Sequence, residues 1–138
     1  MSKEMREYKK MHHKHQKELI QMAKDDYEWD WGFLHDLVIT KIRHMYEYYS
    51  AGNNVCQSEE SLQRTLDTLK HVLDLQNELD TLWDDQCEAT REEIDDYIVQ
   101  LTMSDEDVQK NNEKRERELE IYKEMYAYIG QWMPYWWD

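Results

Sequence analysis

The sequence predicts an all-α protein, and three observations support this fold class. Only three glycines and one proline occur among 138 residues, so few positions would interrupt a helix. The alternation of apolar and polar residues that is typical of a strand is absent, and apolar residues recur at spacings of three and four. We expect a compact bundle of four to five helices, with residues 32–50 and 58–83 forming a central antiparallel hairpin.

The length and hydropathy of the chain predict one domain without a membrane span. A chain of 138 residues can bury a core of its own. No apolar run approaches the ~18 residues that cross a bilayer, and no signal-peptide pattern opens the chain, so we expect a cytoplasmic protein. Four parts follow from composition: a basic N-terminal helix (1–26), a core hairpin (29–83), an acidic segment (84–107), and a C-terminal helix with an aromatic tail (108–138).

The N-terminal helix carries positive charge on a chain whose net charge is −14. Residues 1–24 hold seven basic and three acidic side chains, and the remainder is therefore strongly acidic. Three histidines suggest a metal site, but no cysteine or carboxylate pattern accompanies them. A solvated cationic face is the favoured interpretation, and we expect no bound metal or cofactor. The histidines are His12, His13 and His15, and the predicted inner side of the helix is Tyr8, Met11, His15, Leu19 and Met22.

The stretch 29–49 predicts the helix around which the chain is organised. Apolar residues at 34, 38, 45 and 49 give it a buried stripe, which Lys41 interrupts. Asp30 lies on the same face as Lys41, about 16 Å away along the helix axis, too far for the two charges to pair. Lys41 therefore either extends out of a helix–helix contact to water or binds an anionic ligand.

Cap residues predict where the later helices begin. Ser58 is a candidate N-cap for the helix ending near Trp83, and Ser104 is a candidate N-cap for the last helix. The acidic segment, Asp84–Asp107, holds ten acidic side chains and one arginine. A short helix is expected after Thr90. The predicted inner face of the last helix is Val108, Leu119, Tyr122, Tyr126, Ile129 and Met133.

The motifs favour a protein that is not an enzyme. No Glu-x-x-His pair of the kind used by di-metal bundles occurs, and neither does a glycine-rich phosphate loop. The run from Glu92 to Asp96 is similar to the acidic helix of all-α nucleotide pyrophosphatases, whose carboxylates hold Mg²⁺. The second acidic helix that such an enzyme needs is missing.

The organising stretch also resembles a protein family. It opens with Trp29-Asp30-Trp31, continues with Phe33-Leu34, and then reads Lys41-Ile42-Arg43-His44-Met45; the chain ends in Trp136-Trp137-Asp138. These residues resemble a group of small uncharacterised proteins of tailed bacteriophages, over about 21 residues and the last three. The resemblance implies a viral origin and a role inside the infected host cell, and it implies no particular chemistry.

Two binding functions fit these features. A third alternative is a helical oligomeric assembly protein without a ligand. The first is capture of a small nucleotide-like signal of host defence, in which aromatic rings stack on the ligand and basic groups meet its phosphates. We expect no direct nucleic-acid partner, because the strongly acidic body of the chain repels phosphates. We expect a homo-oligomer, because the chain carries many aromatic side chains for its size. The candidate ligand-binding residues are Trp29, Asp30, Trp31, Lys41, Arg43, His44, Tyr48, Trp136 and Trp137.

The second binding function is inhibition of a basic host protein. A dense acidic segment can imitate nucleic-acid phosphates and occupy the groove of a DNA- or RNA-binding protein. The candidate partner-binding residues are Asp84, Asp85, Glu92, Glu93, Asp95 and Asp96.

Overall fold

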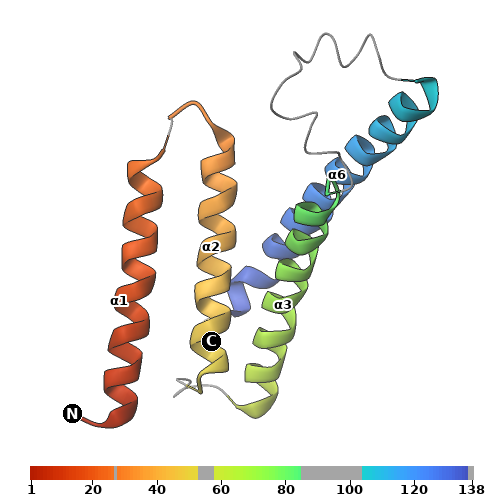
Figure 1. Cartoon of the computed structure of the whole chain (residues 1–138). Helices are drawn as coiled ribbons and strands as arrows, with labels where there is room; N and C mark the ends of the chain where they lie inside the picture. Colours follow the sequence, from red (N-terminus) through yellow and green to blue (C-terminus); the bar gives the residue numbers. More distant parts are fainter. Residues whose placement is uncertain (27, 53–57, 85–103, 137–138) are drawn as a thin grey trace. The chain divides into compact units, whose positions relative to one another are not determined.

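The computed structural model describes residues 1–26, 28–52, 58–84 and 104–136 (Figure 1). These residues form the α-helices α1 (Lys3–Lys24), α2 (Trp31–Ser50), α3 (Glu59–Thr81) and α6 (Asp105–Trp132), followed by the 3₁₀ helix η1 (Met133–Tyr135). The described residues contain no strand, so the predicted all-α class is confirmed. The short helix expected after Thr90 lies outside the described residues.

Short polar side chains begin the helices as the sequence predicts. The first backbone N–H groups of a helix have no partner within it, and a serine or aspartate oxygen can accept from one of them. Ser58 Oγ accepts from the Ser61 N–H at 3.2 Å, and Ser104 Oγ accepts from the Asp107 N–H at 3.2 Å. Ser2 caps α1 in the same way. Gly52 follows α2 with φ +76, a left-handed conformation that glycine adopts without strain.

The chain divides into two compact units. The first unit combines Met1–Leu73 with Tyr135–Asp138, and the second unit is Asp74–Pro134. This division concerns packing, and the single folding domain of residues 1–138 stays a prediction. None of the helices in the described ranges is both long and apolar enough to cross a membrane.

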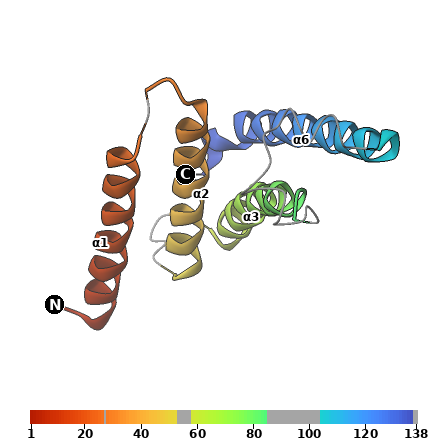
Figure 2. The same cartoon turned by 45° about the horizontal axis from the view of Figure 1, so that its top comes forward.

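In the first unit, α1 and α2 lie side by side and run in opposite directions in both views (Figures 1 and 2). The C-terminal tail is fixed in this unit by Trp136, which is only 2% exposed. Its indole Nε1–H donates to Thr68 Oγ1 at 2.8 Å, and the Tyr49 hydroxyl donates to the Trp136 carbonyl at 2.5 Å. The guanidinium of Arg64 lies over the Tyr135 ring, 5.3 Å from its centroid. The tail therefore joins residues of α2 and α3.

The buried face of α2 differs from the predicted stripe. Leu34 is 62% exposed, and the fully buried positions include His35, Ile42 and His44. The prediction followed apolarity alone, whereas two of these buried side chains are histidines. Imidazole can be buried when its ring nitrogens have hydrogen-bond partners, and Glu18 is such a partner for His44.

In the second unit, apolar side chains at spacings of four form the core. Leu75 and Leu79 of α3 are buried, as are Ile121, Met125 and Ile129 of α6. The predicted inner face of the last helix was correct at Ile129, and Tyr122 is half-buried; the prediction was wrong at Val108, Leu119, Tyr126 and Met133, which are exposed. The buried stripe of α6 is Ile121, Met125 and Ile129, which lack the tyrosine hydroxyls of the predicted face.

Polar contacts surround this second core. The Trp83 indole Nε1–H donates to Glu118 Oε2 at 3.1 Å, and the Lys114 ammonium lies over the Trp83 ring. Arg117 Nη2 lies 2.7 Å from Glu78 Oε1. These contacts fix the register of α6 against the end of α3. The candidate functional side chains belong to the first unit.

Candidate functional site

Two histidine–glutamate pairs cross between α1 and α2. His15 Nε2 lies 2.6 Å from Glu47 Oε2, and His44 Nε2 lies 2.8 Å from Glu18 Oε2. A carboxylate can only accept a hydrogen bond, so each Nε2 carries the hydrogen and donates it. The two imidazole rings stack between these pairs, with centroids 3.8 Å apart and planes 10° apart.

The same spacing on both helices explains the crossed arrangement. Each helix carries the pattern His-x-x-Glu, His15 with Glu18 on α1 and His44 with Glu47 on α2. Residues three apart share a helical face. Because α1 and α2 are antiparallel, the order of the pair is reversed on the second helix, and each histidine faces the other helix's glutamate. This repeated pattern is the sequence signal that could have predicted the site.

Arg43 connects the two pairs. Its guanidinium contacts Glu18 through Nη2, and its Nη1 donates to Glu47 Oε1 at 3.5 Å. The planar group presents donors in a fixed fork, which lets one arginine serve two carboxylates. Arg43 was predicted to meet ligand phosphates, and the structure places it instead in this network as a partner for Glu18 and Glu47.

Burial and hydrogen bonding shift the pKa values of three groups in the network. The hydrogen bond from His44, assisted by Arg43, lowers the pKa of Glu18. For Glu47, burial acts to raise the pKa, but the His15 hydrogen bond and nearby positive charges together outweigh it, so the pKa is lowered. Burial lowers the pKa of His44, and its bond to Glu18 only partly offsets this. The carboxylates are therefore ionised near neutral pH, and His44 is neutral.

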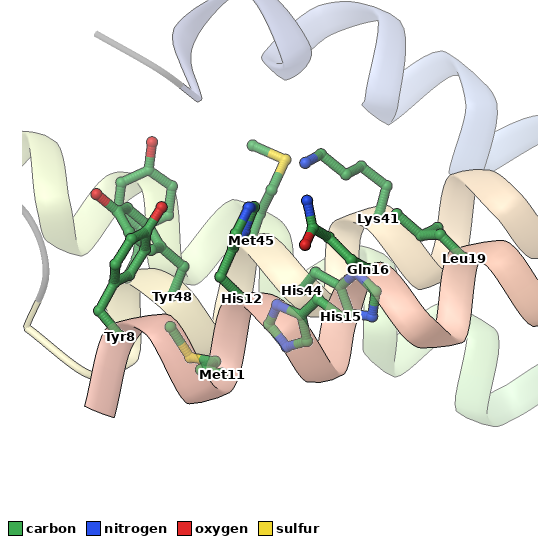
Figure 3. Close-up of a pocket in the computed structure, with 11 residues that line it drawn as sticks. Tyr8, Met11, His12, His15, Gln16, Leu19, Lys41, His44, Met45 and Tyr48 are labelled. Atoms are coloured by element: carbon green, nitrogen blue, oxygen red, sulfur yellow. The ribbon is translucent and has the colours of Figure 1, made fainter. Parts of the chain in front are cut away.

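A cleft of about 240 Å³ opens beside this network between α1 and α2 (Figure 3). Lys41 and Met45 extend into it from α2, and Gln16 extends from α1. Its walls combine aromatic rings, thioethers and imidazoles with a single ammonium group. The lining residues are Tyr8, Met11, His12, His15, Gln16, Leu19, Lys41, His44, Met45, Tyr48 and Tyr49.

Lys41 is the cation of this cleft. Its side chain is exposed and forms no hydrogen bond or ion pair with another residue in the part of the chain that the structure describes. In the sequence, Lys41 is the charged residue that interrupts the apolar stripe of this helix. An ammonium group beside stacked rings is suited to an anionic ligand that also carries a ring.

The structure brings three of the predicted ligand residues together. Lys41, His44 and Tyr48 all line the cleft. His12, His15 and Tyr8 line it too. They were not predicted as ligand contacts, because α1 was expected to be a basic helix with one packing side. His12 and His13 are exposed, as a solvated face requires, whereas His15 is 8% exposed and belongs to the helix interface.

The tryptophans predicted to wall the site lie elsewhere. Trp29 is 84% exposed and Trp31 is 65% exposed, and neither lines the cleft. Asp30 is the N-cap of α2, where its Oδ1 accepts from the Gly32 N–H at 2.9 Å. Asp30 therefore stabilises the start of the helix and does not face Lys41 across a pocket.

The tail contributes to the fold of the first unit. Trp136 is buried against Thr68 and reaches the cleft only indirectly, through the Tyr49 hydroxyl. Trp137 lies outside the described residues, as do Asp85, Glu92, Glu93, Asp95 and Asp96 of the predicted acidic site. Asp84 follows α3, and its backbone N–H donates to the Thr81 carbonyl at 3.1 Å.

Metal ligation does not arise from the crossed pairs. Across residues 1–26, 28–52, 58–84 and 104–136, no group of three or more His, Cys, Asp or Glu side chains is placed to hold a metal ion. The Nε2 atoms of His15 and His44 are engaged by Glu47 and Glu18. Compared with known protein families, with curated proteins and with solved structures, the chain matches none.

Proposed function

We propose that this protein is a non-catalytic binding protein that captures a small anionic, ring-bearing ligand in the cleft between α1 and α2. A nucleotide-like molecule has this chemistry, because it joins a flat base to a phosphate. The base would stack against the tyrosines of the cleft, and the phosphate would meet Lys41.

The observation that carries the proposal is the placement of Lys41. Arg43, a second cationic group in this region, is occupied by Glu18 and Glu47. Lys41 lines the same cleft as Tyr8 and Tyr48 and has no partner among the described residues. A ligand anion would supply that partner, and the neighbouring rings would contact the rest of the ligand.

The size of the cleft limits the ligand. Pockets for drug-sized ligands enclose about 300–1,000 Å³. The value here, about 240 Å³, is below that range. We therefore expect the cleft to enclose one ring and one phosphate group, with any further part of the ligand remaining outside.

The resemblance to small proteins of tailed bacteriophages extends this proposal to a biological role. In an infected cell, a binder of this kind would sequester a nucleotide-like signal of host defence in the cytoplasm. Sequestration requires affinity and no reaction, which agrees with a site built from packing residues and one ammonium group.

Isothermal titration calorimetry tests the proposal. The wild-type protein is titrated with cyclic nucleotides, mononucleotides and ADP-ribose-type nucleotides, in parallel with Lys41→Ala. A charge-assisted contact contributes about 1.5–3 kcal/mol, so Lys41→Ala should weaken binding by about 10- to 150-fold. Lys17→Ala removes an exposed lysine of α1 that does not line the cleft and should leave affinity unchanged. Absence of heat with every nucleotide would overturn the proposal.

A further inference from the structure

A second surface of the first unit has a composition typical of protein recognition. Three large apolar side chains near the start of α2 are exposed: Trp29 at 84%, Trp31 at 65% and Leu34 at 62%. Trp31 and Leu34 are three residues apart on the helix and so share a face. We call Trp29, Trp31 and Leu34 the apolar patch. Tryptophan is one of the residues enriched among the side chains that dominate binding energy at protein interfaces.

Carboxylates lie next to the apolar patch in the sequence. Asp25, Asp26 and Glu28 are exposed in the segment that leads into α2. No lysine or arginine occurs between Lys24 and Lys41. The tryptophans are therefore set in a locally negative field, and an approaching cation would be attracted both by the carboxylates and by the faces of the indole rings.

We propose that the apolar patch and its neighbouring carboxylates dock a basic segment of a partner protein, one that carries arginine beside apolar residues. An arginine guanidinium can stack on an indole ring while it pairs with a carboxylate, and an apolar neighbour would cover Leu34. This docking surface does not line the α1–α2 cleft. The inference is therefore independent of the proposed ligand.

The start of α2 is also held in place, which favours binding. Asp30 fixes the first turn by accepting from the Gly32 N–H, and the Trp31 ring stands edge-on to the ring of the buried His35 at 6.5 Å between centroids. A side chain that is already positioned loses little freedom when a partner binds.

Charge identifies a basic partner in preference to a second copy of this chain. Two copies would each bring a net charge of −14, and this long-range repulsion opposes their association. A basic partner is attracted by the whole molecule as well as by the local carboxylates. Electrostatic attraction of this kind raises the association rate and weakens as salt screens it.

Fluorescence anisotropy with labelled peptides tests the inference. The probe is a twelve-residue peptide of alternating arginine and leucine, compared with a glutamine–leucine peptide of the same length. The full-length wild-type protein should bind the arginine peptide at least tenfold more tightly than the glutamine peptide. The double variant Trp29→Ala, Trp31→Ala should lose at least tenfold in affinity for the arginine peptide, and Ile20→Ala, which truncates another exposed apolar residue, should lose less than twofold.

A pair of charge-matched variants separates this surface from general attraction. One variant combines Asp25→Asn, Asp26→Asn and Glu28→Gln, and the other combines Glu59→Gln, Glu60→Gln and Asp105→Asn at exposed sites on α3 and α6. The first should weaken peptide binding at least fivefold more than the second. Equal weakening by both would overturn the inference, as would full affinity in the tryptophan variant. Self-association abolished by the tryptophan variant, without peptide binding, would assign the surface to a second copy and also overturn it.

Discussion

His15 and His44 stack face to face at 3.8 Å, each with its Nε2 directed at a glutamate of the opposite helix. The stack lies within the α1–α2 interface, and both rings are buried. Two protonated imidazoles at this separation would repel each other strongly, because little water lies between them. The interface is therefore built for a state in which at most one ring is charged.

This arrangement predicts a loss of stability in mild acid. The pKa of His44 lies below its ordinary value of 6.5 in the folded chain, so the unfolded chain binds the proton first as the pH falls. The stability that depends on neutral His44 is complete above about pH 6.5 and is lost below it. Thermal unfolding followed by circular dichroism should show a lower Tm at about pH 5.5 than at about pH 7.5.

His44→Gln provides the control for the acid effect. A glutamine amide can still donate to Glu18 but does not titrate, so this variant should show a smaller fall in Tm over the same interval. His13→Gln changes an exposed histidine and should retain the wild-type fall. A Tm in the wild-type protein that is constant or higher at about pH 5.5 would contradict the interpretation. Below about pH 4.5 a further loss is expected, because the pKa values of Glu18 and Glu47 are lowered from 4.5.

Glu18→Gln tests the crossed pairs more specifically. Glu18 accepts from both Arg43 and His44, and the amide cannot replace the charge that holds both donors. We expect the free energy of unfolding to fall by about 1–2 kcal/mol, a modest value because the carboxylate is one-third exposed. Glu7→Gln affects only a surface pair with Lys3 at 3.9 Å and should cost less than about 0.5 kcal/mol. Urea unfolding curves that coincide for the two variants would show that the network contributes nothing.

Trp136→Ala distinguishes a core residue from a ligand contact. Truncating a buried tryptophan costs about 3–5 kcal/mol, because a cavity forms and apolar contacts are lost. Trp136 is 2% exposed, so we expect a loss of this size in urea unfolding. Trp31→Ala, at a site that is 65% exposed, should cost under about 1 kcal/mol. Similar small losses in both variants would mean that the tail is not part of the core.

The helices could be predicted from the sequence because their signals are local. Apolar spacing places α1 and α2, and Ser58 and Ser104 mark the starts of α3 and α6. The buried face of α2 could not be predicted in the same way. The side of α2 that faces α1 contains His44, whose burial depends on a glutamate 26 residues away on α1.

The candidate site could be predicted only in part, for the same reason. Lys41 was identifiable because a charge interrupts an apolar stripe, and Tyr48 because it lies two turns further along the same helix. Glu18 and Tyr8 come from α1, and their roles depend on how α1 is aligned against α2. Trp29 and Trp31 were predicted to line the pocket because of their ring chemistry. The residue type alone does not determine whether a side chain faces a cleft or solvent.

The position of a bound ligand tests the central claim most directly. In NMR spectra of the isotope-labelled protein, the nucleotide that gives the largest calorimetric heat should shift the ring signals of Tyr8, His12 and Tyr48, while the indole signals of Trp29 and Trp31 stay in place. Lys41→Ala should abolish the shifts at the same nucleotide concentration. Shifts confined to the Trp29 and Trp31 indoles, or no shift with any nucleotide, would contradict capture in the α1–α2 cleft.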